Sequence, residues 1–294
     1  PGLRRQHLAA VNAAAEICDA AVSGAQLGSQ FLNFRPGTIK SGDYSFDIGS
    51  AGSTTLVLQT VLFPLLSTNR TCNITISGGT HNPMAPSFDF IHDTFFPVLN
   101  KMGMHVQGFL ERFGFFPAGG GKIQIQTKEM SNVSPLHITE RGNTKQTKAR
   151  VLLANLPQHI AEREIEILRK TLGDKSDYKV DVVESDGPGN AIVIKQKSDH
   201  ITMTFTAFGE KRLPAPRVAE EAVRQLKFYN TSEAPVDSFL ADQLLLPLAL
   251  AGSGEFVTTE PTQHTQTSKF IIEQFLDIQF AIKQRNEQQW SISL

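Results

Sequence analysis

Apolar side chains recur along this chain with two different periods, and segments of the two kinds alternate. A spacing of three and four residues predicts helices over residues 8–18, 55–63, 88–102, 162–172, 216–229 and 239–250, with a further helix from about Thr267. A spacing of two predicts strands over residues 31–35, 44–48, 72–77, 105–111, 122–127, 147–153, 178–184, 191–195, 201–208 and 255–259. This alternation predicts an α+β protein in which helices pack on sheets.

The order of these elements divides the chain into three parts. Residues 31–127 read as two strands followed by a helix, a strand, a helix and two strands, and the polar stretch Ser131–Pro135 comes next. Residues 140–233 have their own order of strands and helices and are numerous enough to bury a small core. We therefore expect a large domain formed by residues 1–139 and 234–294, with residues 140–233 as a smaller α+β insert domain.

The first predicted helix has an apolar stripe, which is formed by Leu8, Val11, Ala14, Ala15 and Cys18. A helix with one apolar face needs another element against which to bury that face. No strand precedes this helix in the sequence. We therefore expect the fold to include a further N-terminal segment, so that the first part of the large domain is incomplete here.

Composition and charge narrow the function classes. A formal net charge of −1 over 294 residues excludes a broad electrostatic surface for nucleic acid, although it permits a small local site. Arg4, Arg5, His7 and Arg35 could form such a site or be ordinary solvated charges. Two cysteines give neither a disulfide framework nor a metal-ligand spacing, and no apolar run is long enough to span a membrane. We expect a reduced, cytoplasmic protein.

His264 lies in a polar stretch, Glu260–Lys269, between a predicted strand and a predicted helix. An imidazole at a helix N-terminus experiences about half a positive elementary charge from the aligned peptide dipoles. That field disfavours a second positive charge, so the ring is expected to stay neutral, with a lone pair free to attack an electrophile. Because the same helix end stabilises a phosphate, His264 is a candidate nucleophile toward a nucleotide phosphate. The alternative is a histidine in a surface loop.

Two glycine-rich segments invite a comparison with phosphate-binding loops. Residues 49–54, Gly-Ser-Ala-Gly-Ser-Thr, precede an apolar helix and could present backbone N–H groups to a phosphate, or form a tight turn with Ser53 as the helix N-cap. Residues 114–122 do not fit the phosphate-loop pattern, because Phe116 occupies the position of its first glycine and Ile123 that of its hydroxyl residue. We expect a hairpin there.

Two groups of polar residues remain ambiguous. Asp89, His92 and Asp93 share one helix face and could hold a metal, or form a solvated face beside buried phenylalanines. Asp242 and Gln243 interrupt a strongly apolar helix, so they are either exposed or part of a site. Neither group identifies a substrate.

Many collinear motifs match one family over essentially the whole chain. They are Pro1-Gly-Leu-Arg-Arg-Gln-His7, Phe34-Arg-Pro-Gly37, Gly49-Ser-Ala-Gly-Ser53, Ser77-Gly-Gly-Thr80, Pro117-Ala-Gly-Gly-Gly121, Asp186-Gly-Pro-Gly-Asn190, Gly209-Glu-Lys-Arg212, Leu240-Ala-Asp-Gln243 and the segment around His264. On these motifs the chain resembles the RNA 3′-terminal phosphate cyclases. The resemblance implies repeated βαβαββ-type units, similar to the C-terminal domain of translation initiation factor 3, with a smaller domain inserted.

The resemblance also implies a reaction in three steps. His264 would attack the α-phosphorus of ATP to form a histidyl–AMP, the AMP would pass to an RNA 3′-phosphate, and the neighbouring 2′-hydroxyl would displace AMP to close a 2′,3′-cyclic phosphate. Adenylylation supplies a good leaving group for an otherwise difficult attack. The implied partners are ATP and RNA 3′-phosphate ends, with Mg²⁺ or Mn²⁺ to neutralise the triphosphate. The metal ligands and a homodimer are left open.

By the same resemblance, part of the chain would bind ATP. These residues are Gln59, Pro86, Phe239, Leu240, Ala241, Asp242 and Gln243. Gln6 would lie near the phosphates or the RNA end. Phe239 departs from the tyrosine or histidine found in relatives, which keeps stacking on adenine but loses a hydroxyl hydrogen bond.

Family members also carry an N-terminal motif of the Gly-Glu-Gly-Gly-Gly-Gln type and arginines that handle metal and RNA phosphate. This sequence begins after them, so a molecule of this length alone is expected to be severely impaired in catalysis.

The main alternative is a non-catalytic, cyclase-like ribosome-assembly factor, which is expected to lack the histidine. An enolpyruvyl transferase would need a cluster of Lys and Arg that the sequence does not show.

Overall fold

A computed structural model describes residues 2–130 and 133–294 of the chain. Pro1, which begins the first matching motif, and Ser131 and Asn132, which begin the polar stretch after the first part, lie outside the described residues. No helix in the described ranges combines the length and the apolar content that crossing a bilayer requires.

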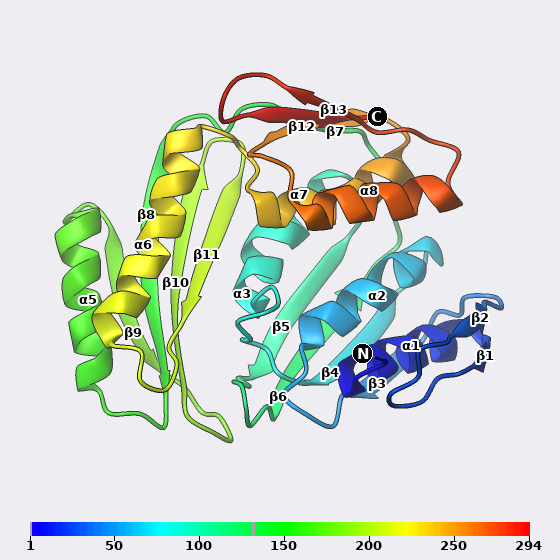
Figure 1. The fold of residues 1–294 in the computed structure, drawn as a ribbon, viewed down its shortest axis with the longest axis horizontal. Helices are drawn as coiled ribbons and strands as arrows, with labels where there is room; N and C mark the ends of the chain where they lie inside the picture. The colour runs from blue at the N-terminus through cyan, green and yellow to red at the C-terminus, as the bar shows by residue number, and fades with distance from the viewer. Residues whose placement is uncertain (1, 131–132) are drawn as a thin grey trace.

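The expected α+β fold is confirmed, with helices and strands interleaved along the chain (Figure 1). The helices are α1 (Arg5–Cys18), α2 (Thr54–Ser67), α3 (Phe88–Phe90), the π-helical turn η1 (Ile91–Phe95), α4 (Phe96–Lys101), α5 (His159–Leu172), α6 (Ala215–Ser232), α7 (Ser238–Ala251) and α8 (Gln263–Phe275). The strands are β1 (Ala21–Ser23), β2 (Asn33–Arg35), β3 (Asp43–Asp47), β4 (Cys72–Gly78), β5 (Val106–Arg112), β6 (Gly121–Thr127), β7 (Leu136–Ile138), β8 (Thr144–Ala154), β9 (Asp177–Val182), β10 (Gly189–Ser198), β11 (Thr202–Phe208), β12 (Gly254–Thr258), β13 (Ala281–Gln284) and β14 (Trp290–Ser293).

One βαβαββ unit occupies residues 43–127. Strand β3 passes through α2 to the parallel strand β4, and the continuous helix α3–η1–α4 leads to the antiparallel hairpin β5–β6. The four strands form a sheet in the order β3-β4-β6-β5. Alternation explains β4 well, since Cys72, Ile74 and Ile76 point into the core and the intervening residues do not.

A second unit of the same order is built from distant parts of the chain. Strand β7 pairs in parallel with β12, and α7, β12, α8, β13 and β14 complete a sheet in the order β13-β14-β12-β7. This order corresponds element by element to the first unit, with residues 139–237 placed between its first strand and its first helix. The order α1-β1-β2 matches the second half of the same unit.

The intervening residues form a sheet of their own, in the order β11-β10-β8-β9. Strands β8 and β9 are parallel and connected by α5, and β10 is antiparallel to both β8 and β11. Helices α5 and α6 pack together on this sheet, on the left of Figure 1. On this basis we propose that residues 140–233 are an insert domain, as the sequence pattern suggests.

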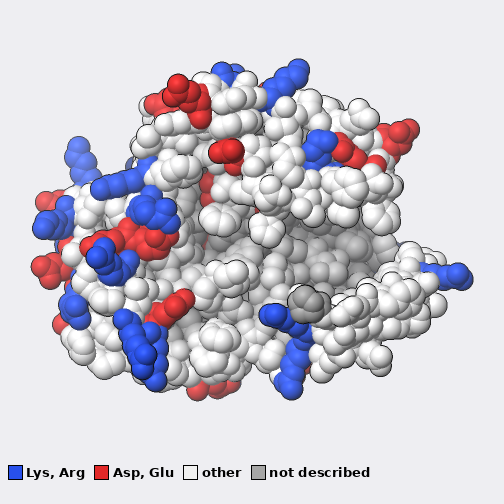
Figure 2. All heavy atoms as spheres, in the orientation of Figure 1, with Lys and Arg blue, Asp and Glu red and all other residues white. Residues whose placement is uncertain are grey.

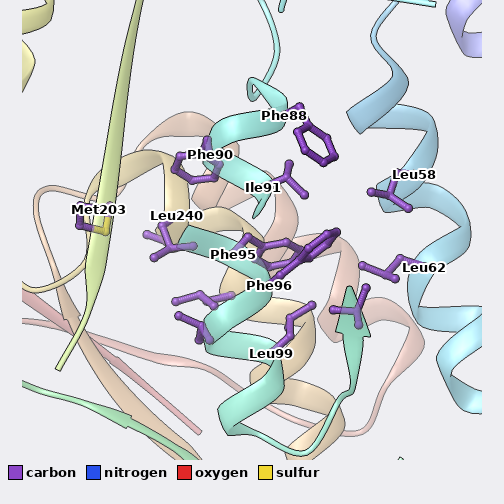
Figure 3. Close-up of a cluster of buried hydrophobic side chains, with 14 of the residues drawn as sticks. Leu58, Leu62, Phe88, Phe90, Ile91, Phe95, Phe96, Leu99, Met203 and Leu240 are labelled. Carbon is purple, nitrogen blue, oxygen red and sulfur yellow. The ribbon is translucent and has the colours of Figure 1, made fainter. Parts of the chain in front are cut away.

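The helix α3–η1–α4 lies at the centre of the hydrophobic core. Figure 3 shows its side chains Phe95 and Leu99 beside Leu62 of α2, and Phe90 near Leu240 of α7. All of these side chains are buried. The central helix therefore joins α2 to α7, the two helices that carry most of the expected ATP-binding residues.

Several short elements were not predicted. Strands β1, β7, β13 and β14 each contain three or four residues, with too few apolar positions to show an alternation. Helix α8 begins at Gln263 rather than near Thr267, because Thr262 acts as its N-cap. The expected hairpin over residues 114–122 is confirmed as the β5–β6 connection.

Candidate active site

The glycine-rich loop before α2 ends in a helix cap. Ser53 is the N-cap, and its Oγ accepts a hydrogen bond from Leu56 N at 3.4 Å. Thr54 N donates to Gly79 O at 2.8 Å. These hydrogen bonds support a helix cap rather than a phosphate-binding loop, because the N–H groups already have protein partners.

Gln6 and Pro86, which lie in two other segments of the chain, form hydrogen bonds with the N-terminus of α2. Gln6 Oε1 accepts a hydrogen bond from Ser53 N at 2.9 Å, which leaves its amide NH₂ without a partner among the described residues. Pro86 O accepts one from Thr55 Oγ1 at 2.7 Å. Two residues that the resemblance assigns to phosphate and ATP binding thus both contact the α2 N-terminus.

Helices α7 and α8 begin beside the same end of β12. Asp237 is the N-cap of α7, and its backbone oxygen accepts a hydrogen bond from Thr258 Oγ1 at 3.3 Å. Thr258 ends β12, and Thr262, the N-cap of α8, follows four residues later. The first N–H groups of a helix have no partner within it, and both helix ends carry partial positive charge. Their proximity favours a bound polyanion.

Side chains of α2 and α7 make direct contact in this region. Gln59 Nε2 donates to Gln243 Oε1 at 2.6 Å, and Gln243 Nε2 donates to Phe239 O at 3.1 Å. The ring of Phe239 is 66% exposed, which suits stacking on a flat ligand. In contrast, Leu240 and Ala241 are fully buried in the core, so neither presents accessible atoms to a nucleotide.

His264 is an exposed residue in the first turn of α8. It does not precede the helix, as the sequence pattern suggested, but lies within it, directly after Gln263. Thr262 Oγ1 accepts from Thr265 N at 3.2 Å, and this cap holds the first turn in place. The imidazole is therefore accessible and at the positive end of the helix, as a nucleophile toward phosphate requires.

Asp242 lies near His264 and has an unusual environment. Burial raises the pKa of Asp242 to about 6, and the nearby His264 opposes the rise. Asp242 Oδ1 is buried and has no hydrogen-bond partner among the described residues. A buried acceptor of this kind is costly unless a ligand or a moving side chain completes it. Asp242, one of two ambiguous polar residues of this helix, is therefore a candidate residue of the site.

Sequence reasoning missed Asp237. Its side chain caps α7 by accepting from Leu240 N at 2.8 Å, and burial, with a contribution from Asp242, raises its pKa to about 7. An Asp directly before an apolar helix is a standard N-cap signal, which could have identified this role. The neighbouring carboxyls of Asp237 and Asp242 thus both titrate near neutrality.

The structure does not support a metal at Asp89, His92 and Asp93. Asp89 Oδ2 is 2.7 Å from His81 Nε2, and its Oδ1 accepts from Arg150 Nη1 at 2.8 Å. Asp93 is held by His92 and by Lys195, both within 2.9 Å. These carboxylates are thus engaged by neighbouring side chains. Across residues 2–130 and 133–294, no group of three or more His, Cys, Asp or Glu is arranged to hold a metal ion.

The basic residues of the N-terminal region are only partly brought to this site. Arg5 Nη1 donates to Gly49 O at 3.3 Å, so Arg5 lies on the loop before α2. Arg4 and His7 are exposed in the same turn, where Arg4 N donates to His7 Nδ1 at 3.2 Å. Arg35 is exposed at the end of β2, opposite Ala21.

A hollow in the surface lies between the α7–α8 layer and α1, with α2 behind it (Figure 2). Lys and Arg side chains stand at its lower edge, beside the beginning of the chain. The N-termini of α2, α7 and α8, the Gln59–Gln243 hydrogen bond and Asp242 beside His264 together form a site suited to a nucleoside polyphosphate and to nucleophilic attack on it.

A comparison with protein families agrees with this geometry. A family model described as RNA 3′-terminal phosphate cyclase matches residues 1–282 of the chain. The match includes the first βαβαββ unit, the intervening sheet, and the second unit through α8 with His264, and it ends at the beginning of β13. The chain therefore belongs to the RNA 3′-terminal phosphate cyclase family.

Proposed function

We propose that this protein converts an RNA 3′-terminal phosphate to a 2′,3′-cyclic phosphodiester at the expense of ATP. The observation that carries the proposal is that His264 lies close enough to Asp242 to influence the pKa of its carboxyl, on a helix that packs beside the one bearing the Gln59–Gln243 hydrogen bond. These residues come from three helices, and by the resemblance each would fall at a position that serves ATP binding or catalysis.

In the first step, an imidazole nitrogen of His264 forms a bond to the α-phosphorus of ATP. The bond from that phosphorus to the bridging oxygen breaks, and pyrophosphate leaves with the electron pair. Asp242 can accept a hydrogen bond from the other imidazole nitrogen through its unpartnered Oδ1, which would orient the ring and stabilise developing positive charge. The N-termini of α7 and α8 would stabilise the phosphates.

In the second step, an oxygen of the RNA 3′-phosphate attacks the adenylyl phosphorus and displaces His264, which gives an RNA–adenylate. The 2′-oxygen then attacks the 3′-phosphorus, AMP leaves, and the 2′-hydroxyl proton passes to solvent or a base. Gln6 can donate its free amide N–H to a phosphate oxygen at the α2 N-terminus. Because the described side chains form no metal cluster, we assign no step to the divalent cation that the resemblance implies.

The proposal is tested with the full-length protein, ATP and a single-stranded RNA that ends in a 3′-phosphate. We expect ATP-dependent formation of a 2′,3′-cyclic end, and its loss in His264→Ala. His137→Ala, which changes an exposed histidine on β7, is the matched control and should stay active. Undiminished cyclisation by His264→Ala would show that His264 is not the nucleophile. No cyclisation by the wild-type protein would favour the non-catalytic, ribosome-assembly relative instead.

A further inference from the structure

Three of the glycine-rich motifs pack directly on one another. A Cβ added to Gly119 would lie 2.9 Å from Ala51 Cα, and one added to Gly187 would lie 2.5 Å from Ala118 Cβ. The loops 49–53, 117–121 and 186–190 are therefore closely packed on one another. Glycine at Gly119, with φ of +72°, serves both an unusual backbone conformation and this close approach. These loops form a continuous surface that extends from the α2 N-terminus to the insert domain.

Two apolar side chains project from this surface into solvent. Phe115 is buried against His81, whereas the next residue, Phe116, is 68% exposed. Met84 is 93% exposed on the loop that precedes α3. Both segments touch the loop before α2, because Asn82 Nδ2 donates to Ala51 O at 2.7 Å and Gly119 packs on Ala51. We refer to Phe116 and Met84 as the Phe116 platform.

The same loop also contacts cationic and amide donors. Arg5 is anchored on Gly49 O, and Gln6 on Ser53 N. The acidic side chains nearby are engaged within the protein: Asp47 Oδ1 accepts from Gly49 N, and Asp186 forms an ion pair with Arg112. A phosphate at Arg5 and Gln6 therefore meets donors, and the segments that carry the apolar platform contact the same loop.

Single-stranded nucleic acid is bound by this combination of groups, since cations hold the backbone and bases stack on aromatic and apolar side chains in a sequence-tolerant way. We propose that the Phe116 platform binds a base of the last few nucleotides of the RNA, while the terminal phosphate lies at the N-terminus of α2. This inference rests on the proposed function and extends it to the path of the RNA strand. Such stacking would not depend on the base sequence of the RNA.

The test compares Phe116→Ala with Phe116→Tyr in the full-length protein. The probe is a 5′-fluorescent, single-stranded RNA with a 3′-phosphate, and its affinity is measured by fluorescence anisotropy. We expect the Ala variant to bind about tenfold more weakly, and the Tyr variant to bind like the wild type. Phe109→Ala is the matched control, because Phe109 is also strongly exposed but lies on β5, outside the three stacked loops. Formation of histidyl–AMP from ATP alone should be the same in all four proteins.

A second measurement identifies the base that stacks. Probes with an abasic residue at each of the last three positions should show one position at which the wild type loses affinity and Phe116→Ala loses nothing more. Equal RNA affinity of Phe116→Ala and wild type would overturn the inference and leave the apolar platform to a protein partner. Failure of the proposed function is distinct, because it would appear as absent histidyl–AMP in the wild-type protein, whatever the RNA affinity.

Discussion

At the scale of single residues, the chemistry depends on the protonation of Asp242. Its carboxyl is half-buried, one oxygen has no partner among the described residues, and its pKa is raised from 3.8 to about 6. Only the ionised carboxylate can act as a pure acceptor toward the imidazole N–H of His264. The carboxyl is protonated below pH about 6 and ionised above it, so the competent form predominates at neutral pH.

We therefore predict that the rate of His264 adenylylation rises as the pH increases through about 6, where Asp242 ionises. Asp242→Asn should lower this rate about 100-fold at neutral pH and remove the part of the rise that depends on this carboxyl, because the amide cannot ionise. Single-turnover labelling with ATP across pH 5–8 measures both effects. The control is Asp277→Asn, which changes an exposed carboxylate after α8. An unchanged pH profile in Asp242→Asn would show that this carboxyl does not act on the histidine.

Residue chemistry was only partly predictable. His264 could be singled out because a helix follows a polar stretch, and Asp242 because it interrupts an apolar helix. The burial of Asp242 and its approach to His264 depend on contacts between α7 and α8, which no local pattern encodes. For the acidic residues of the central helix, the sequence suggested a metal site that the structure does not support. Asp89 and Asp93 share a face as expected, but that face meets Arg150 and Lys195 of the distant sheet.

At the scale of elements, α5 carries a buried acid that the mechanism does not use. Glu164 is fully buried, and its Oε2 accepts a hydrogen bond from Asn190 Nδ2 at 3.0 Å. Burial raises its pKa from 4.5 to about 7. Because the folded protein binds the proton more tightly than the unfolded chain, the stabilising contribution is complete below pH about 4.5 and is lost as the pH rises through about 7.

The pH dependence of the free energy of unfolding should show the effect of the raised pKa of Glu164. Glu164→Gln keeps an acceptor for Asn190 but cannot ionise, so at pH 8 its free energy of unfolding should exceed that of the wild type by roughly 2–3 kcal/mol. The two proteins should differ little at pH 5. Denaturant unfolding at both pH values measures the difference, and Glu166→Gln, on an exposed face of α5, is the control. A constant difference between wild type and Glu164→Gln at the two pH values would refute the raised pKa.

Elements with strong periodicity were predicted well, and short ones were not. Helices α2 and α7 are rich in Leu and tolerate Pro64 and Pro247 within them, and both were identified from the apolar run. Strands β13 and β14 have few apolar positions, and Trp290 and Ile292 alternate over too short a distance to predict a strand. β14 is stabilised by pairing with β12, and β13 by pairing with β14, rather than by local sequence.

At the scale of the whole molecule, ion pairs join the central helix to the insert sheet. Arg150 of β8 donates to Asp89 of α3 and, through Nε, to Asp181 of β9, each at 2.8 Å. Lys195 of β10 pairs with Asp93 in η1 at 2.8 Å. The sequence pattern suggested an insert, but these contacts join residues about 60 to 100 positions apart and could not be inferred from it.

Removal of Arg150 should weaken this junction. In Arg150→Met the carboxylates of Asp89 and Asp181 lose a shared partner, which we expect to cost roughly 2 kcal/mol of unfolding free energy, after allowance for the partial exposure of Arg150. Lys179→Met removes another partner of Asp181, but Lys179 is far more exposed, so this control should cost less than about 0.5 kcal/mol. Chemical denaturation of the three proteins provides the comparison, and equal stabilities would contradict the structural role of Arg150.

The most direct test of the central claim is to locate the adenylyl group. The full-length protein is incubated with ATP alone and digested, and the modified peptide is identified by mass spectrometry. We expect one acid-labile adenylyl group on the imidazole of His264 in the wild-type protein, and none in His264→Ala. No adenylylation of the wild-type protein, or an adenylyl group on a different residue, would contradict it.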